Sequence, residues 1–140
     1  MSRRVLFEIN VLLDVLTQRE PFFNEAGWLW TLAEKRQVEG LVSAMSLPTS
    51  YYLMRSEVGH RRAISGLKAV RSVFEIVELD DLMIEQAIEG GFGDFEDGIQ
   101  ACAALRANAD WIVTRDVRGF RKSQVPALQP AELIARLRES

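Results

Sequence analysis

The stretch GDFEDGIQACAAL, at residues 93–105, places three carboxylates directly before a run of small apolar residues: Asp94, Glu96 and Asp97. Acids in the first turn of a helix are stabilised by its dipole by roughly 0.3–1 kcal/mol each, and Asp is a favoured N-cap. Helix capping accounts well for Asp94 and Glu96. It accounts poorly for Asp97, which shares a helical face with Ala101, Ala104 and Leu105. We expect that face to pack on a sheet and Asp97 to point into a crevice.

Two further acids follow predicted strands. Glu8 ends the strand RVLFE at residues 4–8, and Asp116 lies two residues beyond the strand DWIVT at 110–114. Sites in open parallel sheets form beyond the carboxyl ends of the strands, so these acids converge if the two strands are neighbours. Crowded carboxylates repel one another unless a divalent cation neutralises them, and oxygen ligands of this kind suit Mg²⁺ or Mn²⁺. The acids therefore predict a metal site.

The elements that must position these acids alternate between strands and helices. Strands are predicted at 4–8, 38–44, 74–79, 110–114 and 125–128. Helices are predicted at 10–16, 22–36, 46–56, 60–73, 80–91, 94–108 and 130–140, with Ser46 as the N-cap of the third. Such alternation predicts an α/β fold with a mainly parallel sheet and helices on both faces. We find no internal repeat or linker, so residues 1–140 are expected to form a single domain.

Composition describes an ordinary globular protein and excludes several classes. Of the 140 residues, 48% are hydrophobic and 26% charged, and no apolar run approaches the ~18 residues that span a bilayer. The net charge of −3 argues against a broadly basic nucleic-acid coat, although 14 of the 17 cations are arginines, which suit local phosphate contacts. With one cysteine and one histidine, a zinc site or a Cys–His pair has little support. We expect a cytoplasmic protein without a signal peptide or membrane contact.

Four segments resemble the PIN-domain family, over almost the whole chain. They are VLFEINVLLDVL, SAMSLPTSYYL, DFEDGIQACAAL and ADWIVTRDVRGF. The pattern DFED…ADxIVTRD…F is similar to one bacterial and archaeal branch in particular. The resemblance implies a three-layer α/β/α sandwich with a small, mainly parallel sheet. It also implies an Mg²⁺- or Mn²⁺-dependent ribonuclease acting on single-stranded or structured RNA, often the toxin paired with a cognate antitoxin, and usually a homodimer.

The resemblance also assigns roles by position. Glu8, Asp97 and Asp116 become the catalytic metal ligands, and Asp94 becomes an auxiliary acid of the metal. Polar residues beside the acids are expected to orient them: Asn10, Thr114 and Thr49.

The roles of several other residues allow two interpretations. Arg115 either contacts the scissile phosphate or is simply solvated, and Arg118 either holds the RNA backbone or adds surface charge. Asp14 lies one turn after Asn10, and we expect it to be solvated or partly buried rather than to support the site. Trp28 and Trp30 cannot share a helical face, so one of them is expected at the surface.

Two departures from the family pattern keep an alternative open. Glu8 stands where the family has Asp, which moves the carboxylate by roughly 1.5 Å, and Thr49 stands where many members have Glu. The alternative is a catalytically degraded PIN-like module that binds a protein or RNA partner. A receiver or an aspartate-nucleophile phosphatase is a third possibility, but the first strand ends FEIN, without paired aspartates or a DxD motif.

Overall fold

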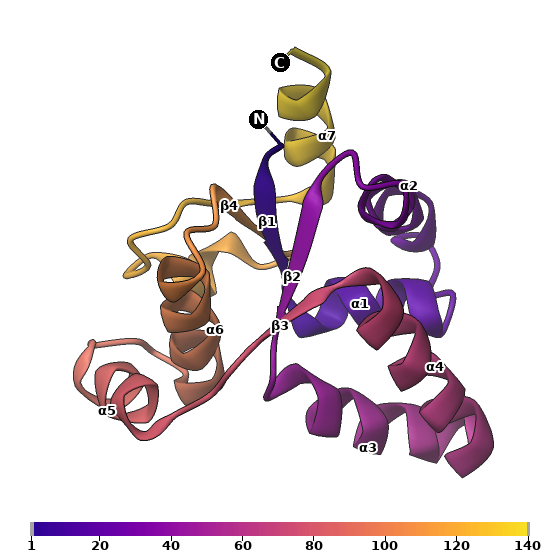
Figure 1. Ribbon diagram of the computed structural model, residues 1–140, viewed down its shortest axis with the longest axis horizontal. Coiled ribbons are helices and arrows are strands. Elements are labelled where there is room, and N and C mark those ends of the chain that lie inside the picture. The colour runs from indigo at the N-terminus through magenta and orange to yellow at the C-terminus, as the bar shows by residue number, and fades with distance from the viewer. Residues whose placement is uncertain (1, 140) are drawn as a thin grey trace.

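The computed structural model describes residues 2–139 and is built on a five-stranded sheet of order β3-β2-β1-β4-β5. The strands are β1 (Arg4–Phe7), β2 (Glu39–Ser43), β3 (Glu75–Val77), β4 (Trp111–Val113) and β5 (Ala127–Leu128). Every pair of neighbouring strands is parallel. The sheet therefore has one common carboxyl edge, which lies at the opposite end of β1 from the two chain termini (Figure 1).

Helices cover both faces of the sheet, which confirms the predicted three-layer α/β/α architecture (Figure 1). One face is covered by α1 (Ile9–Leu16), α2 (Phe23–Glu34), α4 (His60–Val73) and α7 (Pro130–Glu139). The other is covered by α5 (Asp81–Glu89) and α6 (Phe95–Arg106), with the 3₁₀ turn η1 (Val117–Phe120). The remaining helix, α3 (Ser46–Val58), packs on α4 and α1.

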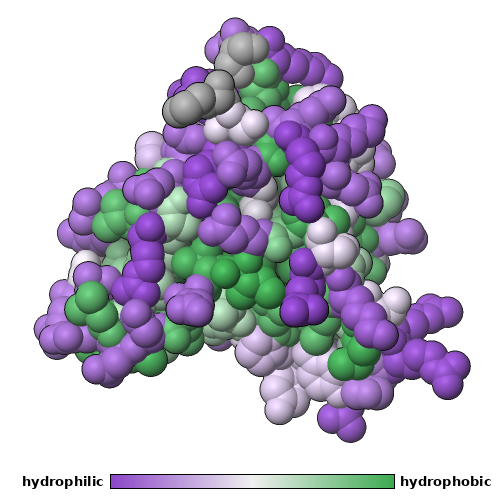
Figure 2. Space-filling view, viewed as in Figure 1, coloured by the Kyte–Doolittle hydropathy of each residue, from purple (hydrophilic) through white to green (hydrophobic). Residues whose placement is uncertain are grey.

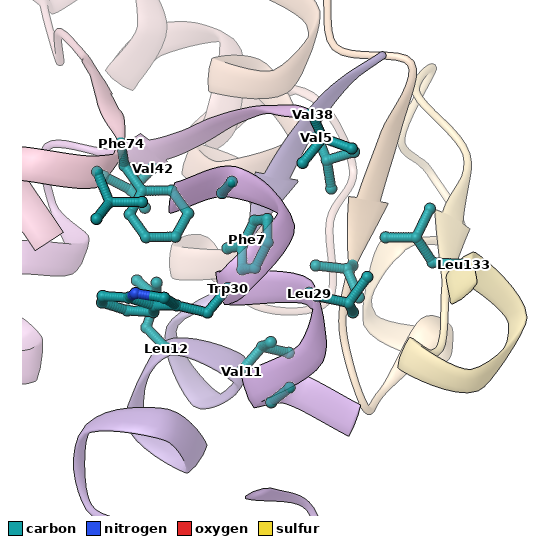
Figure 3. Packing of buried hydrophobic residues seen from close by; sticks show 14 of the residues in the cluster. Val5, Phe7, Val11, Leu12, Leu29, Trp30, Val38, Val42, Phe74 and Leu133 are labelled. Carbon is teal, nitrogen blue, oxygen red and sulfur yellow. The ribbon is translucent and has the colours of Figure 1, made fainter. Parts of the chain in front are cut away.

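The strands are apolar almost throughout because both of their faces are buried, as is usual in parallel sheets. Along β1, Val5 and Phe7 point into the core on the α1/α2 side, whereas Leu6 points into the core beneath α5 and α6. The core on the α1/α2 side is aromatic around Phe7. The ring of Phe74 packs edge-on against those of Phe7 and Trp30, with ring centres 4.8 Å and 5.0 Å apart (Figure 3). This packing fixes the β1 strand from which Glu8 projects.

The two tryptophans of α2 separate as predicted. Trp30 is 8% exposed and belongs to the core, whereas Trp28 is 37% exposed and lies under the guanidinium of Arg138 at 5.4 Å. Hydrophilic residues cover most of the face seen in Figure 2, and apolar ones gather toward its centre. Over residues 2–139, no helix combines the length and the apolar character that a membrane crossing requires.

Three details predicted for helices α3 and α6 were wrong. Ser46 is not an N-cap but the first residue of α3, preceded by Met45 in helical conformation, and its buried hydroxyl has no hydrogen-bond partner among residues 2–139. Leu105 does not lie on the buried face of α6 and is 46% exposed. It lies eight residues after Asp97, and 3.6 residues per turn rotate it by about 80° away from that face. The helix also ends at Arg106, before Asn108, whose φ of 56° is left-handed.

Gly40 tests how tightly this core is packed. A Cβ at Gly40 would lie 2.6 Å from the Phe74 ring, which Phe7 and Trp30 hold in place. Gly40→Ala is therefore expected to lower the free energy of unfolding in urea by about 1–3 kcal/mol. The control is Gly27→Ala within α2, where the nearest atom is 3.9 Å away and a gain of roughly 0.5–1 kcal/mol is expected. Equal effects at both positions would contradict the packing described.

Candidate active site

The pairing of β1 with β4 brings the first two acids together. The strands run parallel with Phe7 opposite Val113, and the backbone N–H of Glu8 donates to the Val113 carbonyl at 3.1 Å. Glu8 and Thr114 therefore leave the sheet side by side, and Asp116 follows two residues later. Glu8 itself lies just beyond the strand, not within it as predicted, because it is the N-cap of α1.

Both carboxylate oxygens of Glu8 are held by neighbouring groups. Oε2 accepts hydrogen bonds from the backbone N–H of Asn10 at 3.0 Å and from its Nδ2 at 3.2 Å, and Oε1 accepts from the Thr114 hydroxyl at 3.4 Å. The residue is only 7% exposed. Burial raises the pKa of Glu8, with a smaller contribution from the charge of Asp97, against the hydrogen bonds that favour the charged form. Asn10 and Thr114 thus lie where residues that orient the first acid are needed.

Thr114 also connects the two acids of the strand ends. Its hydroxyl oxygen accepts a hydrogen bond from the backbone N–H of Asp116 at 3.1 Å while the hydroxyl donates to Glu8. Thr114 is 1% exposed, so this link is shielded from water. It shapes the turn that carries Asp116 from the buried strand to the surface.

The third acid reaches the same place from α6. Asp94 is the N-cap, as the capping argument requires, and its Oδ1 accepts from the backbone N–H of Asp97 at 3.0 Å. Gly119 of η1 lies against the side chain of Asp97: a Cβ there would collide with the carboxylate and would lie 3.7 Å from Oδ2 of Asp116. The missing side chain at Gly119 therefore lets Asp97 and Asp116 approach each other.

These side chains line a cavity of about 520 Å³ at the carboxyl edge of the sheet. Its walls carry five carboxylates, from Glu8, Asp94, Glu96, Asp97 and Asp116. The other lining residues are Ile9, Asn10, Thr49, Leu53, Gln100, Thr114, Arg115 and Phe120. All but one of the predicted site residues therefore lie in one cavity. The exception is Arg118, an exposed residue of η1 that is not part of this lining.

The crowding of carboxylates has an electrostatic cost. Burial raises the pKa of Asp97 from its ordinary 3.8 to about 6, and the charges of Asp94, Asp116 and Glu96 add to the shift. Each neighbour makes the ionised form of Asp97 less favourable, because like charges in a partly dry site repel. At neutral pH the cavity therefore holds charge that a cation would relieve.

The donors suit a hard divalent cation, although they do not enclose one in this arrangement. Carboxylate, amide and hydroxyl oxygens are the ligand types that Mg²⁺ and Mn²⁺ prefer, and the charges of the neighbouring acids add to the effect of burial in raising the pKa of Asp97. Among residues 2–139, however, no three His, Cys, Asp or Glu side chains are grouped so that they could hold a metal ion. The chemistry of the site fits the cation, and its carboxylates would have to draw closer around it.

Asp14 differs from its prediction. It is 1% exposed, not solvated or partly buried, and its carboxylate pairs with Arg115 and more distantly with Arg19. Arg19 in turn donates to Oδ1 of Asn10 at 3.4 Å, which leaves the Nδ2 of Asn10 facing Glu8. Arg115 is accordingly not a freely solvated side chain. It is held against Asp14 while it lines the cavity.

Gln100 was missed by the sequence interpretation. It is 1% exposed, lines the cavity, and its Oε1 has no hydrogen-bond partner. A signal was present: Gln100 is a polar residue one turn after Asp97, within an otherwise small and apolar helix. Leu53 of α3 was missed as well, and nothing in its sequence context marks it as part of a cavity wall.

A family model matches most of the chain, and proteins similar to it are known. Residues 4–118 match the family model described as the PIN domain. The Ribonuclease VapC1 of Aquifex aeolicus is 24% identical, with 96% of each chain covered. The VapBC2 structure from Rickettsia felis, bound to a DNA fragment from its promoter, superposes with a TM-score of 0.68 at 16% identity and covers 90% of this chain and 98% of that one. VapC20 of Mycobacterium tuberculosis, a sarcin-ricin loop cleaving toxin, gives 0.64 at 16% identity, over 77% and 86%.

The raised pKa of Asp97 predicts a dependence of stability on pH. Between about pH 4 and 6 the Asp97 carboxyl binds more protons in the folded chain than in the unfolded chain, so its contribution to stability falls as the pH rises through this window. Asp97→Asn removes the ionisable group. Without added metal, it is expected to raise the melting temperature at pH 7.5 by a few degrees, with the gain shrinking toward pH 4. The measurement is thermal unfolding in EDTA.

Asp81→Asn is the matched control, because Asp81 lies in the first turn of α5 as Asp97 lies in the first turn of α6, but Asp81 is exposed whereas Asp97 is partly buried. It loses the same helix-dipole interaction without relieving any crowding, so a small loss of stability at pH 7.5 is expected. If Asp97→Asn behaved like Asp81→Asn at every pH, the carboxylates would not be repelling one another.

Gln100 predicts a gain of stability on removal of its amide. A buried polar atom without a partner costs about 1–3 kcal/mol. Gln100→Met keeps the length of the side chain and is expected to raise the free energy of unfolding by an amount in this range, measured with urea. Gln124→Met, at an exposed position, should have little effect. A destabilised Gln100→Met protein would show that the amide is satisfied in solution.

Proposed function

The chain belongs to the PIN-domain family, and from this premise we propose that it is a divalent-metal-dependent endoribonuclease that hydrolyses phosphodiester bonds of RNA. The observation that carries the proposal is the convergence of Glu8, Asp97 and Asp116, from three separate segments, on one cavity beyond the parallel strands. A site that binds the negatively charged RNA backbone has no use for five carboxylates unless a cation lies between them and the phosphate.

Mg²⁺ or Mn²⁺ would be held by Glu8, Asp97 and Asp116, with Asp94 beside them. When bound, such an ion activates water and stabilises the charge that develops on the phosphate. The protein's own contribution is to keep the acids in place. Asn10 and Thr114 hold Glu8 by hydrogen bonds, and Thr114 holds the turn of Asp116.

Arg115 is the contact we propose for the phosphate, since among residues 2–139 it supplies the only positively charged side chain of the cavity lining. A guanidinium presents two parallel N–H groups to phosphate oxygens. Arg118 lies on the exposed side of η1, outside the cavity, and we propose that it contacts the RNA backbone further along. Thr49, on the α3 wall, faces the same substrate space and adds a neutral hydroxyl.

The biological setting we propose is that of a toxin held by a cognate antitoxin. The names of the relatives support this: a ribonuclease at 24% identity and a toxin–antitoxin complex from Klebsiella pneumoniae that shares the fold. A homodimer in the cytoplasm remains a prediction of the resemblance. The specific observation that favours the alternative, a degraded module that binds a partner, is the Glu8 side chain, which already uses both carboxylate oxygens in hydrogen bonds.

Cleavage of RNA separates the enzyme from the module. Single-stranded RNA is expected to be cut in the presence of Mn²⁺ and not in EDTA, and Asp116→Ala should lower the rate by at least about 100-fold, since lesser changes around a metal cost 10–100-fold. Glu8→Asp should raise the rate, more with Mg²⁺ than with Mn²⁺, because Mg²⁺ demands near-ideal octahedral geometry. Gel analysis of a labelled RNA gives these rates.

Asp81→Asn serves as the control, since it removes a carboxylate that is not part of the cavity lining. If the wild type cuts no RNA but Glu8→Asp does, the natural protein is the degraded module. If neither form cuts any RNA with either metal while both still bind a partner protein, the nuclease proposal fails.

A further inference from the structure

Asp14 is a buried carboxylate whose partners the proposed reaction does not explain. It lies on α1 at 1% exposure, one turn after Asn10. Its Oδ2 lies 2.9 Å from Nε of Arg115, and its Oδ1 accepts from a terminal nitrogen of the same guanidinium at 3.3 Å. A charge buried so completely is tolerated only when it is paired, so Asp14 and Arg115 depend on each other.

Arg115 is fixed from a second side by an aromatic ring. The guanidinium carbon lies 3.9 Å from the centre of the Phe22 ring, within the range of a cation–π contact. The backbone is held as well, because Nε2 of Gln129 donates to the Arg115 carbonyl at 3.4 Å. Arg115 therefore stays at the wall of the cavity, with its charge directed toward Asp14.

Without these restraints, Arg115 would pair with other carboxylates. Five carboxylates line the cavity that Arg115 borders, and one of them belongs to the adjacent residue, Asp116. A guanidinium forms strong two-pronged contacts with carboxylates. A released Arg115 would turn toward these acids and neutralise them, and it would then compete with a divalent cation for the same oxygens.

We propose that Asp14 is a positioning residue: by pairing with Arg115, the one cationic side chain that residues 2–139 contribute to the cavity lining, it holds this charge at the cavity wall and so leaves the carboxylates open to a divalent cation. That Arg115 then contacts a phosphate of the RNA rests on the proposed function. The effect on cation binding does not depend on RNA cleavage and is measured separately.

Arg19 also contacts Asp14, but it has a second acidic partner. It is the second cation near Asp14, at 3.9 Å, but it also pairs with Glu57 at 3.7 Å. When Asp14 is neutralised, Glu57 still holds Arg19, so the hydrogen bond from Arg19 to Asn10 is expected to persist. The consequence of losing the Asp14 charge should be transmitted mainly through Arg115.

The test is the dissociation constant for Mn²⁺, measured by calorimetry on folded, metal-free protein with no RNA present. Asp14→Asn keeps the shape of the side chain and removes its charge, and it is expected to weaken Mn²⁺ binding by about 10–100-fold. Adding Arg115→Gln to that variant should restore the dissociation constant to near the wild-type value. A merely structural role for Asp14 would not produce this restoration. Asp80→Asn breaks a 2.8 Å pair with Arg106 at the far end of α6 and should leave Mn²⁺ binding unchanged.

Phe22→Ala provides a second route if Asp14→Asn does not fold, since Phe22 is 37% exposed and outside the core. It loosens Arg115 and should weaken Mn²⁺ binding in the same direction, again reversed by Arg115→Gln. The inference is overturned if Asp14→Asn or Phe22→Ala folds and binds Mn²⁺ as the wild type does, if Arg115→Gln restores nothing, or if the wild type binds no Mn²⁺. A protein that shows the expected pattern of Mn²⁺ binding but cuts no RNA would support the role of Asp14 and refute the proposed activity.

Discussion

The parallel pairing of β1 with β4 is the constraint on which the rest of the site depends. One backbone hydrogen bond, from Glu8 to Val113, fixes where the two strands end relative to each other. Because side chains in a strand alternate between faces, a shift of one residue would turn Glu8 and Thr114 away from each other. The aromatic packing of Phe7 against Phe74 holds β1 in that register from one face, and Leu6 holds it from the other. A buried hydrophobic core is thus what aligns the polar edge.

That alignment buries and crowds the carboxylates, and the surrounding residues offset the cost in stability only in part. Hydrogen bonds from Asn10 and Thr114 favour the charged form of Glu8, yet burial still raises its pKa. Asp97 has few such partners, and its pKa rises to about 6. Stability is lost at sites that must hold strained or repelling groups, and such perturbed acids in a cleft are typical of functional sites. The crowding is therefore better understood as a feature of function than of folding.

Arginine placement decides whether this charge stays available. Cations close to an acidic cavity would normally fill it. Here Arg115 is paired with Asp14 and stacked on Phe22, and Arg19 is shared among Asp14, Glu57 and Asn10. The buried acid on α1 and the acids of the cavity thus attract the same arginine from two sides. On this view, the proposed divalent cation and Asp14 divide the arginine and the carboxylates between them.

The sequence by itself determined the layered α/β fold, because alternating apolar strands and amphipathic helices have few other ways to bury their faces. It also located the acids, since strand ends and a helix N-terminus are recognisable from local patterns, and Glu8, Asp97 and Asp116 do line one cavity. Helix details that depend on a fraction of a turn, such as the exposure of Leu105, were beyond it. So were Asp14 and Gln100, whose burial depends on which helices and strands pack over them. Only the tertiary structure decided that Arg115, 101 residues further along the chain, is the partner of Asp14. A local pattern specifies which groups are present, but long-range packing determines which of them lose contact with water and with what they pair.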